Sequence, residues 1–227
     1  MPLASSTVTV LRQHPWFATL PAPLAEALLA MAQVQHFDAG QRLFSRGDEA
    51  SGLYALVSGT VRIGATSSCG KEALLAVLQA PAWFGEIAVF DGRARTHDAF
   101  TASPVELLLF PQRELLALLA REPYYWRDLA LLMTHKLRLT FGALEDMSLL
   151  PTAQRLAKRL LLIAEHYGEG EPRQVLHLPQ EQLAMMLSLS RQTTNQLLKE
   201  LQAQGVIALT YAEITILDFV RLREIAG

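Results

Sequence analysis

The chain has 227 residues, 51% of them hydrophobic and 19% charged, which is enough for two modest packed domains and excludes an intrinsically disordered chain. Its formal net charge of −2 means that bulk charge gives no affinity for nucleic acid, so such affinity would need cations gathered on one face. No apolar run is long enough for a transmembrane helix, no signal peptide begins the chain, and the single cysteine, Cys69, excludes an internal disulfide, so we expect a cytoplasmic protein.

The N-terminal part of the chain changes its hydrophobic pattern near residue 33. Residues 1–10 are expected to lack regular structure, and residues 14–32 predict a short apolar anchor followed by a helix. Between about 33 and 110 the pattern becomes a series of short strands separated by glycine-containing turns. The apolar run 53–57 is expected to be a central strand, and 105–110 to close the fold. Regular short strands of this kind predict an antiparallel roll or barrel.

The middle of the chain is helical. A short helix from residue 113 is stopped by Pro123, and a long helix follows from about 125 to 148. One stripe of this helix recurs at alternating steps of three and four, which is the pattern of a helix that pairs with its own copy: Ala130, Met133, Leu137, Thr140, Leu144 and Met147. A second stripe, which includes Leu129 and Leu132, is expected to pack on the roll. The alternative is one broad buried face in a monomer.

Residues 178–205 predict two short helices joined by a tight turn. Ser190 is a good N-cap for the second helix, and Gly205 is a good residue to end it. One face of the second helix carries Leu197, Leu198 and Leu201, and the other face is polar. This is the layout of a helix-turn-helix, whose second helix places side chains on base edges in the major groove.

The polar face of that helix has side chains suited to DNA. Arg191 can bind a guanine edge, Gln192 or Gln196 can pair with adenine, and Ser190, Thr193 and Lys199 can hold phosphates. Gln180, at the start of the preceding helix, is also predicted to contact DNA. The runs 206–209 and 213–217 predict a two-stranded wing. The alternative is an ordinary helical hairpin with a solvated polar face.

A second candidate site lies inside the predicted roll, in residues 83–96. Gly85 is expected to start a short helical turn whose amides can face an anion. Glu86 can accept a hydrogen bond from a sugar hydroxyl, and Arg95 and Thr96 can bind a phosphate. A carboxylate and a guanidinium together indicate a nucleotide. The alternative is a structural ion pair between Glu86 and Arg95.

Other chemistries have less support in the sequence. One cysteine cannot hold an iron–sulfur cluster, and the six histidines form no close pair for haem or a metal ion. No nucleophile–base or metal constellation indicates an enzyme. Cys69 is expected at a hairpin tip without a role.

The residues Gly85, Glu86, Ile87, Ala88, Arg95 and Thr96, together with the run from Ser190 to Lys199, resemble the motifs of the CRP/FNR superfamily of bacterial transcription regulators. The resemblance covers about residues 14–220. It implies an α+β chain with an N-terminal antiparallel β-roll (a cyclic-nucleotide-binding-like jelly roll), a long dimerisation helix and a C-terminal winged helix-turn-helix. We expect these over residues 1–122, 123–150 and 151–227, with a hinge at 148–151.

The resemblance also implies partners and residue roles. It implies a homodimer on double-stranded DNA at a pseudo-palindromic operator, with RNA polymerase as a partner and no membrane. In cyclic-nucleotide members the glutamate binds the ribose hydroxyl and the Arg–Thr pair binds the cyclic phosphate, here Glu86, Arg95 and Thr96. Thr140 lies where a hydroxyl reaches the base.

Departures from the family pattern leave the effector open. His97 and Asp98 follow Thr96 where a small residue is usual, and Phe141 replaces a second hydroxyl. No cofactor is required, and the candidate effectors are cyclic AMP, cyclic GMP and cyclic di-GMP. The alternative functions are a constitutive DNA-binding regulator with a vestigial sensor, and a nucleotide-responsive subunit that regulates a protein partner.

Overall fold

The computed structural model describes residues 3–67, 70, 72–168 and 172–227. The chain divides into two compact units, one of residues 1–67 with 75–137 and one of residues 68–74 with 138–227. Cys69 lies outside the described residues, as do residues 169–171. None of the described helices has both the length and the apolar character needed to cross a bilayer.

Two four-stranded antiparallel sheets form the roll of the first unit. One sheet has the order β1-β8-β3-β6 and the other the order β2-β7-β4-β5. The strands are β1 (Gln33–Phe37), β2 (Arg42–Phe44), β3 (Gly52–Ser58), β4 (Thr60–Thr66), β5 (Glu72–Gln79), β6 (Ala82–Phe84), β7 (Asp98–Thr101) and β8 (Val105–Pro111). The predicted central strand is confirmed, since β3 pairs with both β8 and β6.

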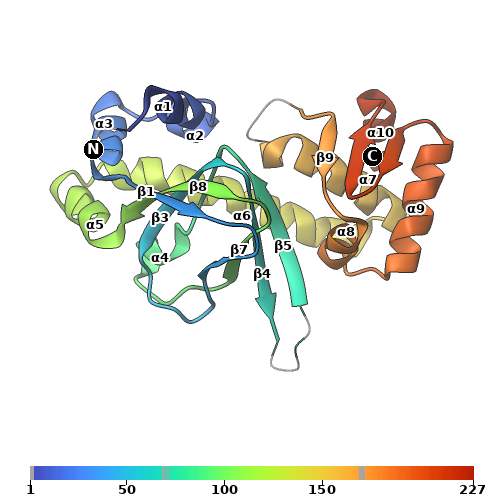
Figure 1. The fold of residues 1–227 in the computed structure, drawn as a ribbon, viewed down its shortest axis with the longest axis horizontal. Coiled ribbons are helices and arrows are strands. Elements are labelled where there is room, and N and C mark those ends of the chain that lie inside the picture. Colours follow the sequence, from blue (N-terminus) through green and yellow to red (C-terminus); the bar gives the residue numbers. More distant parts are fainter. Residues whose placement is uncertain (1–2, 68–69, 71, 169–171) are drawn as a thin grey trace. The chain divides into compact units, whose positions relative to one another are not determined.

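Strand β3 is apolar on both faces because each face belongs to a different core. Tyr54 and Leu56 point into the roll, where they meet Phe44 and Phe84. Leu53, Ala55 and Val57 face a second core that is shared with helices. These helices are α1 (Ser5–Arg12), α2 (Pro15–Ala18), α3 (Ala22–Met31), α5 (Gln112–Arg121) and the start of α6 (Tyr125–Leu149). Figure 1 shows α1, α2 and α3 grouped beside the sheet that contains β1, β8 and β3.

The prediction that residues 1–10 lack regular structure is wrong. They contain most of α1, whose Leu11 is fully buried and whose Thr7 donates a hydrogen bond to Glu106 on β8 at 3.2 Å. Docking on the roll stabilises this helix, because isolated helices of this length are marginal in water. The next helix is held in the same way, since Trp16 Nε1 donates to the carbonyl oxygen of Asp128 on α6 at 2.6 Å.

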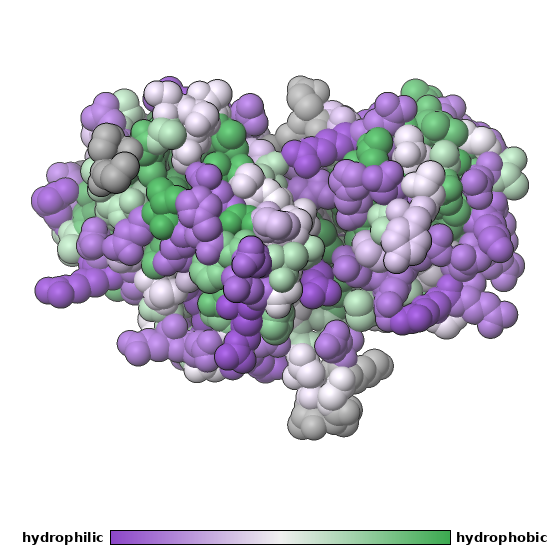
Figure 2. Space-filling model, in the orientation of Figure 1, coloured by the Kyte–Doolittle hydropathy of each residue, from purple (hydrophilic) through white to green (hydrophobic). Residues whose placement is uncertain are grey.

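The long helix α6 has the two stripes that its sequence predicts. Leu129 and Leu132 are buried in the core beneath α2 and α3. Leu137, Leu144 and Met147 of the predicted pairing stripe are each more than half exposed in the single chain. Hydrophilic residues predominate on the face drawn in Figure 2. The exposed stripe is therefore an apolar surface that this chain does not cover itself.

The second unit is a helical group with a small sheet. Its elements are α7 (Thr152–Ala164), the 3₁₀ turn η1 (His166–Gly168), β9 (Val175–His177), α8 (Gln180–Leu187), α9 (Arg191–Ala203), β10 (Ile207–Thr210), β11 (Glu213–Ile216) and α10 (Phe219–Ala226). Helices α8 and α9 are neighbours, and α10 lies against α7 (Figure 1). The predicted two-stranded wing is in fact three-stranded, in the order β10-β11-β9.

Candidate functional site

The segment of residues 83–96, called the cassette below, contains a short helix after strand β6. Gly85 has a φ of +89°, and α4 (Ile87–Asp91) follows it and ends at Gly92 with a φ of +63°. A Cβ atom at Gly85 would lie 2.8 Å from Nη1 of Arg95 and 3.1 Å from the carbonyl oxygen of Gly52, so a larger residue would displace the guanidinium and would be strained at this φ. Backbone hydrogen bonds then fix Arg95, which donates to the carbonyl oxygen of Asp48 and accepts from Gly47, both at 2.8 Å.

The Arg95 side chain is turned into the roll and is only 4% exposed. Its Nη1 donates to the carbonyl oxygen of Gly85 at 3.0 Å, and its Nη2 donates to the carbonyl of Gly52 at 2.7 Å and to Ser51 Oγ at 3.1 Å. A guanidinium has five N–H donors. The Nε group is buried and has no hydrogen-bond partner among the described residues. Arg95 therefore retains donor capacity that the protein itself does not use.

Aromatic rings flank the same guanidinium. Its central carbon lies 4.4 Å from the centroid of the Phe44 ring and 5.6 Å from that of Tyr54. Burial lowers the pKa of Arg95, while Tyr54 and the carboxylates of Glu86 and Asp48 act in the opposite direction. Because arginine stays protonated in proteins, the site keeps a desolvated positive charge. Such a charge favours an anionic ligand.

Glu86 is buried at the start of α4 but does not pair with Arg95 through any hydrogen bond. Its carboxylate instead accepts from Nζ of Lys136, on α6, at 2.7 Å. Lys136 also donates to the carbonyl oxygen of Trp83 at 2.6 Å. The alternative of a Glu86–Arg95 ion pair is therefore wrong. The sequence prediction missed Lys136, although it stands one helical turn before Thr140 on the same face of α6.

The other predicted effector residues differ in their surroundings. Ala88 is buried, and its carbonyl accepts from Nε2 of Gln112 at 2.8 Å, whereas Ile87 is 40% exposed. Thr96 is exposed, and its hydroxyl lies 2.9 Å from Nδ1 of His97. Thr140 and Phe141 lie on α6 in the second unit, so their place beside an effector stays a prediction.

The Asp98 carboxylate, two residues after the predicted phosphate ligand Thr96, is held by the turn at Arg46. Its Oδ1 accepts from the backbone N–H of Arg46 at 2.8 Å. Burial lowers the pKa of His97, Arg46 lowers it further, and Asp98 opposes the change. His97 and Asp98, which depart from the family pattern, thus interact with each other and with the turn at Arg46.

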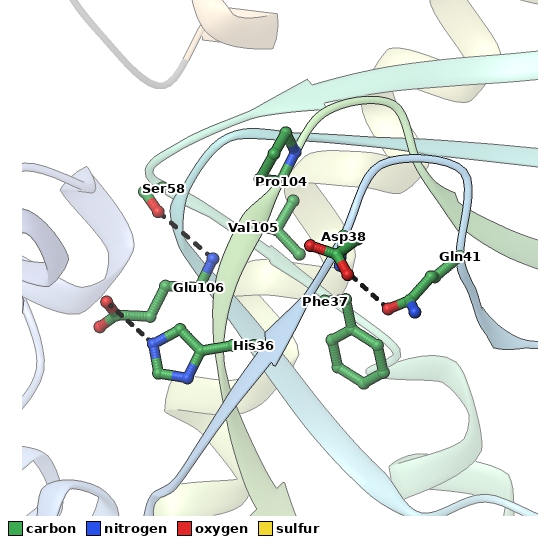
Figure 3. A pocket seen from close by; sticks show the side chains of 8 residues that line it. All are labelled: His36, Phe37, Asp38, Gln41, Ser58, Pro104, Val105 and Glu106. Atoms are coloured by element: carbon green, nitrogen blue, oxygen red, sulfur yellow. Dashed lines mark hydrogen bonds and ion pairs between the residues drawn. The ribbon is translucent and has the colours of Figure 1, made fainter.

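A hollow elsewhere on the first unit contains none of the predicted effector residues. It is lined by His36, Phe37, Asp38, Gln41, Ser58, Pro104, Val105 and Glu106 (Figure 3). The Glu106 carboxylate lies 3.6 Å from Nε2 of His36, and the backbone N–H of Glu106 donates to Ser58 Oγ at 3.2 Å. Across the part of the chain that the structure describes, no three His, Cys, Asp or Glu side chains are arranged to hold a metal ion.

The helix-turn-helix of the second unit has the predicted geometry. Ser188 adopts a left-handed conformation between α8 and α9, and Ser190 caps α9 by accepting from the Thr193 N–H at 3.0 Å. Gly205 stands two residues after the last residue of α9, with a φ of +71°. Thr194, Leu198 and Leu201 are the buried side of α9. Its exposed side carries Arg191, Gln192, Thr193, Gln196 and Lys199.

Contacts between α8 and α9 hold part of this exposed side. Arg191 forms an ion pair with Glu181 on the first turn of α8. Gln180, the residue before Glu181, accepts a hydrogen bond from Asn195 Nδ2 at 2.9 Å and so supports α9. Gln196 donates to Glu200 at 3.1 Å. The sequence prediction placed Asn195 on the polar face of the second helix but gave it no role, and it did not include Glu181.

Comparisons with known proteins agree with this arrangement. Residues 34–122 match the family model of the cyclic nucleotide-binding domain, and residues 154–225 match that of the Crp-like helix-turn-helix domain. A Mycobacterium tuberculosis protein named CRP-like cAMP-activated global transcriptional regulator is 32% identical over 205 residues, which cover 89% of this chain and 91% of that protein.

Two further relatives cover nearly the same length. The cyclic AMP receptor protein of Thermus thermophilus is 30% identical over 216 residues, 95% of this chain and 98% of that protein. The structure of FixK2 from Bradyrhizobium japonicum has a TM-score of 0.76 at 18% identity and covers 86% of this chain and 98% of its own, which shows the shared fold. The chain belongs to the CRP/FNR family and is a DNA-binding transcriptional regulator.

Proposed function

We propose that this regulator works as a homodimer whose affinity for its operator is controlled by a cyclic nucleotide bound at the cassette. The observation that carries the proposal is the buried Arg95 guanidinium, whose Nε has no hydrogen-bond partner among the described residues and whose Nη1 donates to Gly85, two residues before α4. A buried cation with spare donors is costly unless an anion completes its hydrogen bonds.

The residues near Arg95 supply the remaining contacts of a nucleotide. Arg95 and Thr96 bind the cyclic phosphate, with help from the backbone of Gly85, Ile87 and Ala88. Glu86 accepts from the ribose hydroxyl. Thr140 and Phe141 contact the base. Cyclic AMP is the preferred candidate, because the relatives from M. tuberculosis and T. thermophilus are named for it.

The second unit reads the operator. Helix α9 enters the major groove, where Arg191, Gln192 and Gln196 contact base edges and Ser190, Thr193 and Lys199 contact phosphates. Gln180 holds α9 through Asn195 and also contacts the DNA. The exposed stripe of α6 pairs with that of a second copy, which sets the two α9 helices about 34 Å apart, one turn of DNA.

The proposal divides the chain by role. Residues 1–122 sense the effector, 123–150 form the dimerisation helix and hinge, and 151–227 bind DNA. The dimer acts in the cytoplasm on a pseudo-palindromic operator and contacts RNA polymerase there, and it has no catalytic role.

The effector is tested by measuring thermal unfolding of the purified protein with cyclic AMP, cyclic GMP, cyclic di-GMP or no ligand. A bound nucleotide at a hundred times its dissociation constant adds about 2.7 kcal/mol to the free energy of unfolding. Arg95→Ala should remove this gain, and Arg93→Ala, an exposed arginine two residues away, should keep it. An unchanged ligand response of Arg95→Ala would overturn the assignment of the cassette.

A second candidate function is a constitutive regulator with a vestigial sensor. The observation that favours it is that Glu86 already has a cationic partner in Lys136. It predicts no thermal shift with any nucleotide and equal operator affinity with and without them. The same measurement therefore decides between the two functions.

A further inference from the structure

Two hydroxyl groups extend the hydrogen-bond system of Arg95 away from the cassette. Ser51 Oγ lies 3.1 Å from Arg95 Nη2 and 2.9 Å from the hydroxyl oxygen of Tyr54. Tyr54 is 5% exposed and Arg95 is 4% exposed, whereas Ser51 lies at the surface. Ser51 thus joins the two buried groups, Arg95 and Tyr54, from the edge of the roll.

Donor and acceptor roles among these three groups are constrained by the arginine. A guanidinium can only donate, so Ser51 Oγ must accept from Nη2. The Ser51 oxygen has a second lone pair and one proton, and it uses one of these with the Tyr54 hydroxyl. Tyr54 therefore fixes the rotation of the Ser51 side chain, and Ser51 fixes the guanidinium.

Both hydroxyl-bearing residues are also held by other groups. The Tyr54 ring stacks on Phe84, with centroids 5.2 Å apart and an interplanar angle of 9°. The backbone carbonyl of Ser51 accepts from the N–H of Gln112 at 2.9 Å. A Cβ atom at Gly52 would lie 2.0 Å from the carbonyl oxygen of Phe110, so the backbone after Ser51 is packed against β8. Neither hydroxyl can move far without disturbing the sheet.

We propose that Ser51 and Tyr54 are positioning residues that hold the Arg95 guanidinium in the orientation in which it binds the anionic group of the effector. This inference rests on the proposed function, since it takes Arg95 as the phosphate ligand. An arginine side chain loses rotational freedom when it binds a ligand, and a side chain that is already fixed loses less. Ser51 supplies a third acceptor beside the carbonyls of Gly52 and Gly85, and Tyr54 acts on the guanidinium both through Ser51 and directly.

The test is the affinity of the full chain for cyclic AMP and cyclic GMP, measured by titration calorimetry on matched variants. Ser51→Ala should weaken binding about five-fold, as expected for one lost hydrogen bond, and Tyr54→Phe about three-fold. Because Tyr54 acts partly through Ser51, the double variant should lose less affinity than the product of the two single effects, which is about fifteen-fold. Ser51→Thr keeps the hydroxyl and should bind like the unchanged protein.

Two variants of the same chemistry serve as controls. Ser103→Ala removes a hydroxyl from the β7–β8 turn, and Tyr125→Phe removes one from the start of α6. Both should bind like the unchanged protein. Thermal unfolding without ligand shows whether a variant has lost its fold, and if Ser51→Ala has lost it, Ser51→Cys or Ser51→Gly is measured in its place.

The outcomes separate the inference from the proposed function. If the unchanged protein binds neither nucleotide, or if Arg95→Ala binds as well as it does, the proposed function fails and this inference fails with it. If Arg95→Ala abolishes binding but Ser51→Ala leaves it unchanged, only the inference is wrong. The inference is also wrong if the effects of Ser51→Ala and Tyr54→Phe multiply in the double variant, because each residue would then act independently.

Discussion

The ammonium nitrogen of Lys136 lies 2.7 Å from the Glu86 carboxylate and so joins the long helix α6 to the residue that precedes α4. The two residues are fifty positions apart in the chain. The Glu86 side chain is 8% exposed and that of Lys136 is 29% exposed. Any ligand that uses Glu86 as an acceptor must share it with, or take it from, a group on α6.

Lys136→Met should lower the free energy of unfolding by about 1–3 kcal/mol, because it leaves the buried Glu86 carboxylate without its cation. Urea denaturation at pH 7 measures the change. Adding Glu86→Gln should restore most of the loss, since a neutral amide needs no counter-charge. Lys158→Met removes a more exposed ion pair, with Asp146, and should cost less than about 1 kcal/mol. If Lys136→Met and Lys158→Met lowered the free energy of unfolding equally, burial would not be what makes the Lys136–Glu86 pair the stronger one.

Leu144→Glu should convert the protein to a monomer, which light scattering after size-exclusion chromatography would detect. Leu144 is 54% exposed in the single chain and is the next-to-last residue of the predicted pairing stripe. A charge buried between two copies has no partner and costs several kcal/mol. Arg138→Glu, on the same helix but outside the stripe, should remain a dimer. A dimeric Leu144→Glu would show that another surface pairs the copies.

Arg191→Ala should abolish preference at one base pair of the operator while non-specific DNA binding remains. The operator is first defined by selection from random DNA with the unchanged protein. A lost bidentate contact costs about 1–3 kcal/mol of discrimination at that position. Glu181→Gln should reduce discrimination at the same base pair, because Glu181 holds Arg191 in the free protein. Discrimination that shifts to a different base pair would show that Arg191 is not its reader.

Lys199→Ala should weaken binding to all sequences alike and should make the affinity less dependent on salt. Lys199 is exposed on α9 and is proposed to contact a phosphate, and each such contact contributes about −0.9 to the slope of log affinity against log salt. Affinities between roughly 50 and 200 mM salt give this slope. Loss of discrimination without a change of slope would assign Lys199 to base reading.

His97 should make stability depend on pH in a defined window. Its pKa in the folded protein is lowered below the ordinary value of 6.5, first by burial and then by Arg46. The fold therefore favours the neutral ring, and this contribution is fully present above pH 6.5. As the pH falls from there toward the lowered pKa, the unfolded chain takes up the proton first and the folded state loses stability.

His97→Gln should flatten the fall in melting temperature below pH 6.5. The other five histidines remain in both proteins, so the difference between the two curves isolates His97. A difference that instead grows as the pH rises above this value would mean that the folded protein binds the proton more tightly than the unfolded chain.

The sequence predicts those parts of the fold that have a local signal. The apolar run of β3, the stripes of α6, the Ser190 cap and Gly205 are each visible in a few neighbouring residues, and all are found where expected. Their physical causes are periodicity and backbone conformation, which act over one or two turns. The cassette glycine is of the same kind, since the φ of Gly85 favours glycine.

The parts that the sequence does not predict depend on contacts between distant residues. Helix α1 is short, and its buried Leu11 gains a neighbour only when the roll forms. Strand β9 has three residues and exists because β11 pairs with it. The pairing of Glu86 with Lys136 rather than Arg95 is decided by the packing of α6 on the roll, and the role of Ser51 depends on where the Arg95 side chain turns.

The packing of α10 against α7 sets a lower limit on the DNA-binding fragment that could be made for separate study. Helix α10 buries Leu222 and Ala226, and α7 buries Leu156, Leu160 and Ile163, so the first and last helices of this group cover each other. A fragment that keeps only α8, α9 and the wing would expose these apolar surfaces to water and should aggregate. A fragment from Thr152 to Ala226 keeps them covered and is the one to express.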